Sequence, residues 1–307
     1  MAEKWNQSIS EHGDEIKTPE MRSAIHRNLK KVPNHFDEIN KLEKTEREIK
    51  IIFDINEALK KYLDFMGLDP LEIPESDICV LEDSYYRSLK GVNTIQQAHQ
   101  TYGGIHSRIL IPRMENESEF IKILAHEMVH AASYHRTKLD VVIKDDGIVH
   151  TNIGQVVRSG YGFKIKDSSK TNSHNNDFSG PNEAMTEFIA WKVRRNYYKS
   201  QGEDGEKAEE LARMGAYTLE FEILHRVLQK YKQLGNDEQQ LMVDIQRGYF
   251  LGDMRPLKKL QIVHPDAVKL FRDMKHSDIE SLIFTAQAFG FTDYVEKLKE
   301  IAKTIKE

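Results

Sequence analysis

The chain has 307 residues, of which 39% are hydrophobic and 30% charged, and its formal net charge at pH 7 is −5. This composition is typical of a globular protein with an ample core, and the slightly acidic balance argues against bulk attraction to nucleic acid. The only cysteine is Cys79, which excludes an intramolecular disulfide framework.

The N-terminal stretch is polar and lacks the apolar centre of a signal peptide, and no run approaches the length of a membrane helix. We therefore expect a cytoplasmic protein with no membrane partner and no nucleic-acid partner, while export by a signal-independent route stays open.

Residues 1–69 form the first of three predicted regions, and this region is helical. A short helix is expected around Pro19 to Lys31. From Phe36 to Met66 the apolar residues recur with a period near 3.6, which predicts a long helix that ends at Gly67.

Residues 70–200 form the second region, in which short strands accompany two helices. Alternating or short apolar runs predict the strands, and Asp145-Asp146-Gly147 predicts a hairpin turn. The polar stretch from Lys166 to Ser179 predicts a loop, either a flap over a cleft or a passive surface loop. The expected strands are Ile78–Leu81, Ile105–Pro112, Leu139–Ile143, Ile148–Ile153 and Tyr161–Ile165, and we expect them to form a small mixed or antiparallel sheet.

The segment from Asn116 to Ala132 predicts a helix that carries the motif His126-Glu127-x-x-His130. Two histidines four residues apart lie on one helix face, so both imidazoles reach one metal ion, and the glutamate is placed to contact water rather than the metal. Two ordinary histidines on a helix are the alternative. The apolar stripe expected opposite the histidines consists of Ile121, Leu124 and Met128.

A second motif opens another predicted helix, which runs from Glu183 to Lys199. Gly180-Pro181 is a helix-start signal, with the proline expected at the first helical position. Glu183 and Glu187 are four apart and share a face, so one carboxylate would complete a metal site and the other would accept the N–H of a ligating histidine. A solvated acidic face is the alternative, although this helix is otherwise largely apolar at Phe188, Ile189 and Trp191.

Residues 201–307 form the third region, which is predicted to be mostly helical and to act as the second wall of a cleft or as an independent interaction module. The expected helices are Ala208–Leu234, Glu238–Leu251, Pro265–Met274 and Ser277–Thr304. The three regions together predict an α+β, mostly helical fold.

The two motifs together resemble the gluzincin clan of zinc metallopeptidases, to which thermolysin belongs. The resemblance covers roughly residues 105–196 and implies a zincin-like core in which the strand before the zinc helix edges the cleft. By position, it implies Glu127 as general base, Glu187 as the acceptor of a histidine N–H, and Asn182 as the family's asparagine beside the third ligand. The implied ligands of Zn²⁺ are His126, His130 and Glu183.

The third ligand has alternatives. The interval between the histidine motif and Glu183 is longer than in the compact thermolysin type, which leaves room for an inserted hairpin. His150 and His174 are fallback ligands. The metzincin pattern does not fit, because it requires glycine and histidine where this chain has Ser133 and Arg136.

Such a site predicts hydrolysis by a zinc-activated water, with Glu127 as the base that takes its proton. The oxyanion needs a further donor, for which Tyr161, His174 and Tyr217 are candidates. The expected function is a zinc-dependent metallopeptidase that acts on peptides or proteins. A zinc hydrolase of a non-peptide amide and a catalytically silent zincin scaffold that binds a protein partner are the alternatives, and the intact Glu127 argues against the scaffold.

Overall fold

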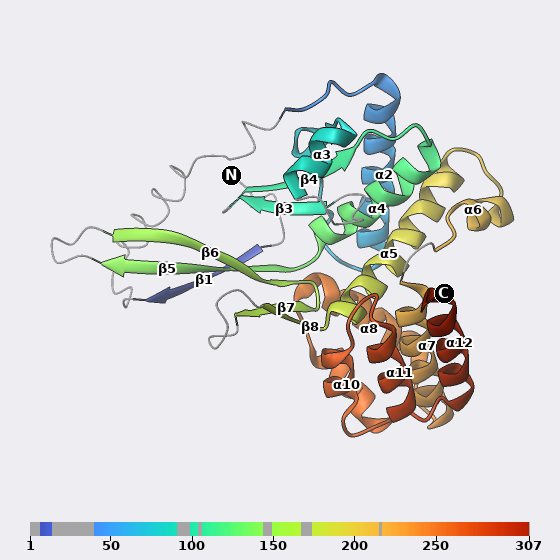
Figure 1. Cartoon of the computed structure of the whole chain (residues 1–307). Helices are drawn as coiled ribbons and strands as arrows, with labels where there is room; N and C mark the ends of the chain where they lie inside the picture. Colours follow the sequence, from blue (N-terminus) through green and yellow to red (C-terminus); the bar gives the residue numbers. More distant parts are fainter. Residues whose placement is uncertain are drawn as a thin grey trace.

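The computed structural model (Figure 1) describes most of the chain. The helix expected around Pro19 to Lys31 and the turn at 145–147 lie outside the described residues. The described residues are 7–13, 40–90, 99–103, 106–143, 149–166, 174–214 and 217–306.

Helix α2 (Glu46–Phe65) begins at a capping box. The side chain of Thr45 accepts a hydrogen bond from the amide of Glu48, and the Glu48 carboxylate accepts one from the amide of Thr45. This reciprocal pair satisfies amides that have no partner in the first turn, so the helix starts at Glu46. The prediction places the helix start at Phe36. This is wrong for residues 40–45, which are described and are not helical, whereas the end before Gly67 is confirmed.

A small sheet follows along the chain, with the strand order β2–β4–β3. Strand β2 (Ile78–Leu81) runs parallel to β4 (His106–Pro112), so an antiparallel arrangement is wrong for this pair, and β3 (His99–Gly103) runs antiparallel on the other side of β4. The strand before the histidine helix is thus paired on both sides. The expectation that this strand is an edge strand is wrong, because β2 and β3 occupy its two sides. The short helices η1 (Glu75–Asp77) and α3 (Asp83–Lys90) flank β2.

A second sheet has the order β1–β5–β6–β7–β8 and contains the predicted hairpin. Strand β5 pairs antiparallel with β6, as expected, and Figure 1 shows both extending with β1 to one side of the helical body. The stretch expected as a loop between Lys166 and Ser179 contains β8, which pairs with β7. The strands are β1 (Gln7–Gly13), β5 (His135–Ile143), β6 (Val149–Ser159), β7 (Gly162–Lys166) and β8 (His174–Asp177).

Helices α4 (Glu117–Ala132) and α5 (Ser179–Ser200) carry the two motifs and pack against each other. Asn116 caps α4, because its side-chain oxygen accepts hydrogen bonds from the amides of Ser118 and Glu119. This start is as predicted. Helix α5 begins two residues before Pro181, so the predicted first position of the proline is wrong.

The remaining chain is helical, as predicted, but with more breaks. The expected helix from Ala208 to Leu234 divides before α7 because Tyr217 has φ 56°, a left-handed conformation that a right-handed helix excludes. The expected helix from Ser277 to Thr304 divides at Gly290, with φ 73°. The helices are α6 (Gly205–Leu211), α7 (Thr218–Gln233), α8 (Glu238–Leu251), α9 (Arg255–Lys258), η2 (Lys259–Ile262), α10 (Ala267–Asp273), α11 (Ile279–Ala288) and α12 (Thr292–Lys306).

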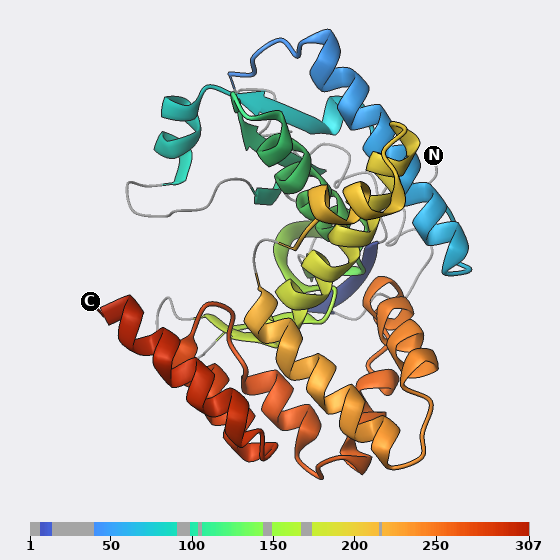
Figure 2. The same ribbon diagram turned by 90° about the vertical axis from the view of Figure 1, so that its right-hand side faces the viewer.

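Helix α5 connects the two halves of the helical body (Figure 2). It contacts α2 and α4 on one side and α7, α8 and α10 on the other. One cluster of buried apolar side chains extends from Ile51 in α2 to Leu298 in α12. The α+β, mostly helical fold class is confirmed, and the division at residues 69/70 and 200/201 stays a prediction. In the part of the chain that is described, no helix has the length and apolarity needed to cross a membrane.

Candidate metal centre

After its first turn, helix α4 is buried except along one narrow face, and its two histidines lie on that face. From Phe120 to Ala132 every side chain is buried except Lys122, His126 and His130, which lie four residues apart. The apolar stripe predicted on the opposite side is confirmed, with Leu124 and Met128 fully buried. Burial of the surrounding positions fixes the rotation of the helix, and this rotation turns both imidazoles toward α5.

The start of α5 is fixed by the C-terminal half of the chain. The amide of Gly180 donates to the carbonyl of Met274, and the amide of Phe178 donates to the carbonyl of Arg272. A Cβ at position 180 would lie 2.9 Å from that Met274 oxygen, so only glycine permits this close approach. Glu183 is then positioned one turn into the helix, opposite the histidines.

Three potential ligand atoms converge between the helices. Oε2 of Glu183 lies 3.1 Å from Nε2 of His130 and 3.4 Å from Nε2 of His126. The ligand atoms of the three residues all lie within 4.8 Å of one another, and the side chains are 13–19% exposed. Two imidazoles and a carboxylate that share one point and stay open to solvent could hold a metal ion.

The other nitrogen of His126 is bound by a buried ion pair. Nδ1 of His126 lies 2.9 Å from Oε2 of Glu187, and Nη2 of Arg194 donates to Oε1 of the same carboxylate at 2.8 Å. Glu187 and Arg194 are 2% and 1% exposed. The guanidinium also donates to the carbonyls of Ala212 and Lys122. The arrangement leaves Nε2 of His126 as the nitrogen that faces Glu183.

The pKa values follow from these contacts. Burial opposes protonation of His126, but hydrogen bonds to Glu183 and Glu187 outweigh it and raise the pKa of His126 to about 10. Burial alone would raise the pKa of both carboxyls. Their hydrogen bonds to histidine, with the charge of Arg194 at Glu187, instead lower the pKa of Glu187 to about 2 and that of Glu183 well below its usual range. At neutral pH and without a metal ion, a proton therefore occupies the cluster.

Tyr217 is the predicted oxyanion donor that the structure brings to this cluster. Its ring stacks on His126 with ring centroids 5.7 Å apart, and it also meets the edge of His276. Burial raises the pKa of Tyr217, and the nearby carboxylates of Glu183 and Glu127 raise it further, so the phenol keeps its proton at neutral pH. Glu127 is buried on α4 between the two histidines and is not one of the three converging residues.

The other predicted site residues lie elsewhere or support the fold. The hydroxyl of Tyr161 donates to the carbonyl of Ile245 at 2.5 Å. Asn182 is buried, and its side-chain oxygen accepts from the amides of Tyr161 and Gly162, which ties α5 to the β6–β7 turn. The side chains of the fallback ligands His174 and His150 lie outside the described residues.

Sequence reasoning missed three polar residues around the cluster, namely Arg194, Thr186 and Tyr249. Thr186 stands in the second motif, but nothing in its spacing indicated that its hydroxyl lies 3.4 Å from Nδ1 of His130. Arg194 lies seven residues after Glu187, which places it on the same face of α5 two turns later. That spacing was a usable signal for Arg194.

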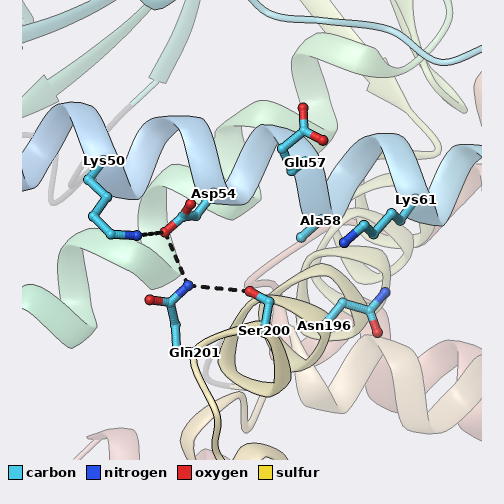
Figure 3. Close-up of a pocket in the computed structure, with 8 residues that line it drawn as sticks. All are labelled: Lys50, Asp54, Glu57, Ala58, Lys61, Asn196, Ser200 and Gln201. Atoms are coloured by element: carbon cyan, nitrogen blue, oxygen red, sulfur yellow. Dashed lines mark hydrogen bonds and ion pairs between the residues drawn. The ribbon is translucent and has the colours of Figure 1, made fainter.

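Two surface pockets lie away from these residues. One, of about 330 Å³, lies between α2 and the end of α5 (Figure 3), where the side chains of Lys50, Asp54, Ser200 and Gln201 bond to one another. Another, of about 640 Å³, is lined by residues of α2, α5, α7 and α8. Neither pocket is lined by a residue of the three-residue cluster.

The chain matches no known protein-family model, no curated protein sequence and no solved structure. Its function is therefore inferred from the side chains described above.

Proposed function

We propose that this protein is a zinc-dependent peptidase of the gluzincin type, with His126, His130 and Glu183 as zinc ligands and Glu127 as general base. The observation that carries the proposal is the convergence of Nε2 of both histidines on one oxygen of Glu183, while Nδ1 of each histidine has an outer hydrogen-bond partner.

The donor set fits zinc. Tetrahedral ligands about 2.0–2.1 Å from a zinc ion lie about 3.4 Å from one another. The separations of 3.1 and 3.4 Å between Glu183 and the two histidines match this spacing. Two imidazoles and one carboxylate are also the protein ligands of a catalytic zinc site that keeps a position open for water.

A bound zinc ion would supply a Lewis acid and lower the pKa of a water molecule. The protein residues do the rest. Glu127 accepts a proton from the attacking water and returns it to the leaving amine. The protonated phenol of Tyr217 donates a hydrogen bond to the developing oxyanion. Glu187 accepts the Nδ1 proton of His126 and keeps that ring oriented.

Strand β3 supports a peptide as substrate. Among the described strands of its sheet, β3 and β2 are the two that are paired on a single side, and α4 contacts β3 as well as the central strand β4. An unpaired strand edge beside the zinc helix offers backbone groups to an extended peptide.

A peptide library tests the function. The zinc-loaded chain should cleave a subset of the library, and a zinc chelator should abolish the cleavage. A chain that holds zinc but cleaves no peptide would contradict the proposal.

Zinc binding should release about one proton per ion near pH 7.5, because the pKa of about 10 at His126 means that the metal-free cluster holds a proton that a ligating imidazole must lose. The zinc association constant should therefore rise about tenfold per pH unit from pH 7 to pH 9. Calorimetry in buffers of different ionisation enthalpy measures the proton count. An affinity that is independent of pH would exclude His126 as a ligand.

The two glutamates of α5 should differ in their effect on zinc. Glu183→Gln removes a ligand and should weaken zinc binding by more than about 100-fold. This loss exceeds the roughly 10- to 100-fold loss that is typical when only a hydrogen-bond partner of a ligand is removed. Glu187→Gln removes only the acceptor of the His126 N–H and should weaken binding about 10-fold. Competition with a chromophoric chelator measures both, and the opposite order would mean that the roles are exchanged.

A further inference from the structure

Helix α8 reaches the metal cluster through one buried phenol. Tyr249 is fully buried, and its hydroxyl lies 2.6 Å from Oγ1 of Thr186. The same Oγ1 lies 3.4 Å from Nδ1 of His130. A chain of hydrogen bonds thus leads from the C-terminal helical region to a ligand of the proposed zinc site.

The single hydroxyl proton of Thr186 decides the direction of these bonds. Oγ1 lies 2.8 Å from the backbone carbonyl of Asn182, which can only accept, so the threonine donates its proton there. Oγ1 has only lone pairs left for its other two neighbours, so the hydroxyl of Tyr249 and the Nδ1–H of His130 must both donate. Neutral His130 then keeps its lone pair on Nε2, the nitrogen that faces Glu183.

Two further features hold Tyr249 in this role. Burial raises the pKa of Tyr249, so the phenol keeps the proton that it donates. Its ring also lies against Gly160, where a Cβ would come within 2.4 and 2.9 Å of ring carbons. Any larger residue at position 160 would displace the ring.

We infer that Tyr249 is a positioning residue of the metal centre. Its hydroxyl orients Thr186, and Thr186 fixes the tautomer of His130 that presents Nε2 to the metal. The inference rests on the proposed zinc site and makes α8 of the C-terminal region part of that site.

Tyr249→Phe tests the inference, because it removes the hydroxyl and keeps the packed ring. We expect the full-length variant to bind zinc about tenfold more weakly in chelator competition. Tyr161→Phe is the matched control. Tyr161 is similarly buried, its ring centroid lies 5.9 Å from that of Tyr249, and its hydroxyl donates to the backbone carbonyl of Ile245 rather than to Thr186. Its zinc affinity should stay within about twofold of the wild type.

A double-mutant cycle separates positioning from general loosening of the core. Thr186→Val and Thr186→Val/Tyr249→Phe should weaken zinc binding equally, since Tyr249 is inferred to act on His130 through the hydroxyl of Thr186, and Thr186→Ser should restore most of the affinity. The absorption spectrum of the cobalt-loaded protein should change in Tyr249→Phe and not in Tyr161→Phe.

The outcomes distinguish a failure of the inferred role of Tyr249 from a failure of the proposed zinc site. If the wild type binds zinc and the two tyrosine variants bind it equally, the role of Tyr249 is overturned and the zinc site stands. If the wild type binds no zinc, the proposed function is overturned and the role of Tyr249 falls with it.

Discussion

Glu127→Gln is expected to lower kcat for peptide hydrolysis by about 10²- to 10⁴-fold while zinc stays bound. Glutamine has the shape of glutamate but cannot take a proton from water. Glu127 is buried on α4 and is not among the three converging ligand residues, so its loss should leave the metal site intact. Steady-state kinetics on a peptide cleaved by the wild type, together with the zinc content of the variant, measure both expectations.

Glu119→Gln is the matched control for this substitution. Glu119 lies two turns earlier on the same helix, and its side chain is 44% exposed beside Lys122. Its kcat should equal that of the wild type. A Glu127→Gln variant with full activity would show that another group takes the proton, and a variant that loses zinc would show that Glu127 is a ligand.

Arg194→Met is expected to lower the free energy of unfolding by about 3–5 kcal/mol. The substitution removes the guanidinium from the buried carboxylate of Glu187, so that Glu183 and Glu187 share the single charge of protonated His126, and it leaves the carbonyl of Ala212 without the donor that Arg194 provides. Urea unfolding of the chain in excess chelator measures this cost without a contribution from metal binding.

The neighbouring Arg195 provides the control for Arg194. It pairs with Glu209 at 2.5 Å, with side chains 40% and 43% exposed, so Arg195→Met should cost less than about 1 kcal/mol. The double variant Glu187→Gln/Arg194→Met should recover part of the loss, because no unpaired buried charge is left. An Arg194→Met variant as stable as Arg195→Met would contradict the importance of the buried pair.

The histidine helix is predictable from sequence because its signals are local. The cap at Asn116, the buried positions of Leu124 and Met128 and the four-residue spacing of the histidines all depend on residues within a few turns. The same holds for Glu183 and Glu187 on α5. The packing of these two helices against each other was expected only because their two motifs together resemble those of the gluzincin clan.

Features that depend on distant partners were not predictable. The pairing of β4 on both sides is set by strands that the sequence pattern does not match to one another. The left-handed Tyr217, which divides a predicted helix, interrupts a segment whose local pattern reads as continuous. Tyr249 is 63 residues from Thr186. From sequence alone, a tyrosine in a largely apolar helix is expected to be a core residue, and the partner of its hydroxyl is known only from the structure.

The metal content of the purified protein tests the central claim most directly. Plasma mass spectrometry of the wild type should find about one zinc ion per chain, and the His126→Ala variant, prepared in the same way, should hold almost none. A wild-type protein that binds no metal after zinc is supplied at neutral pH would contradict the account. The three converging side chains would then be only a hydrogen-bonded cluster between two helices.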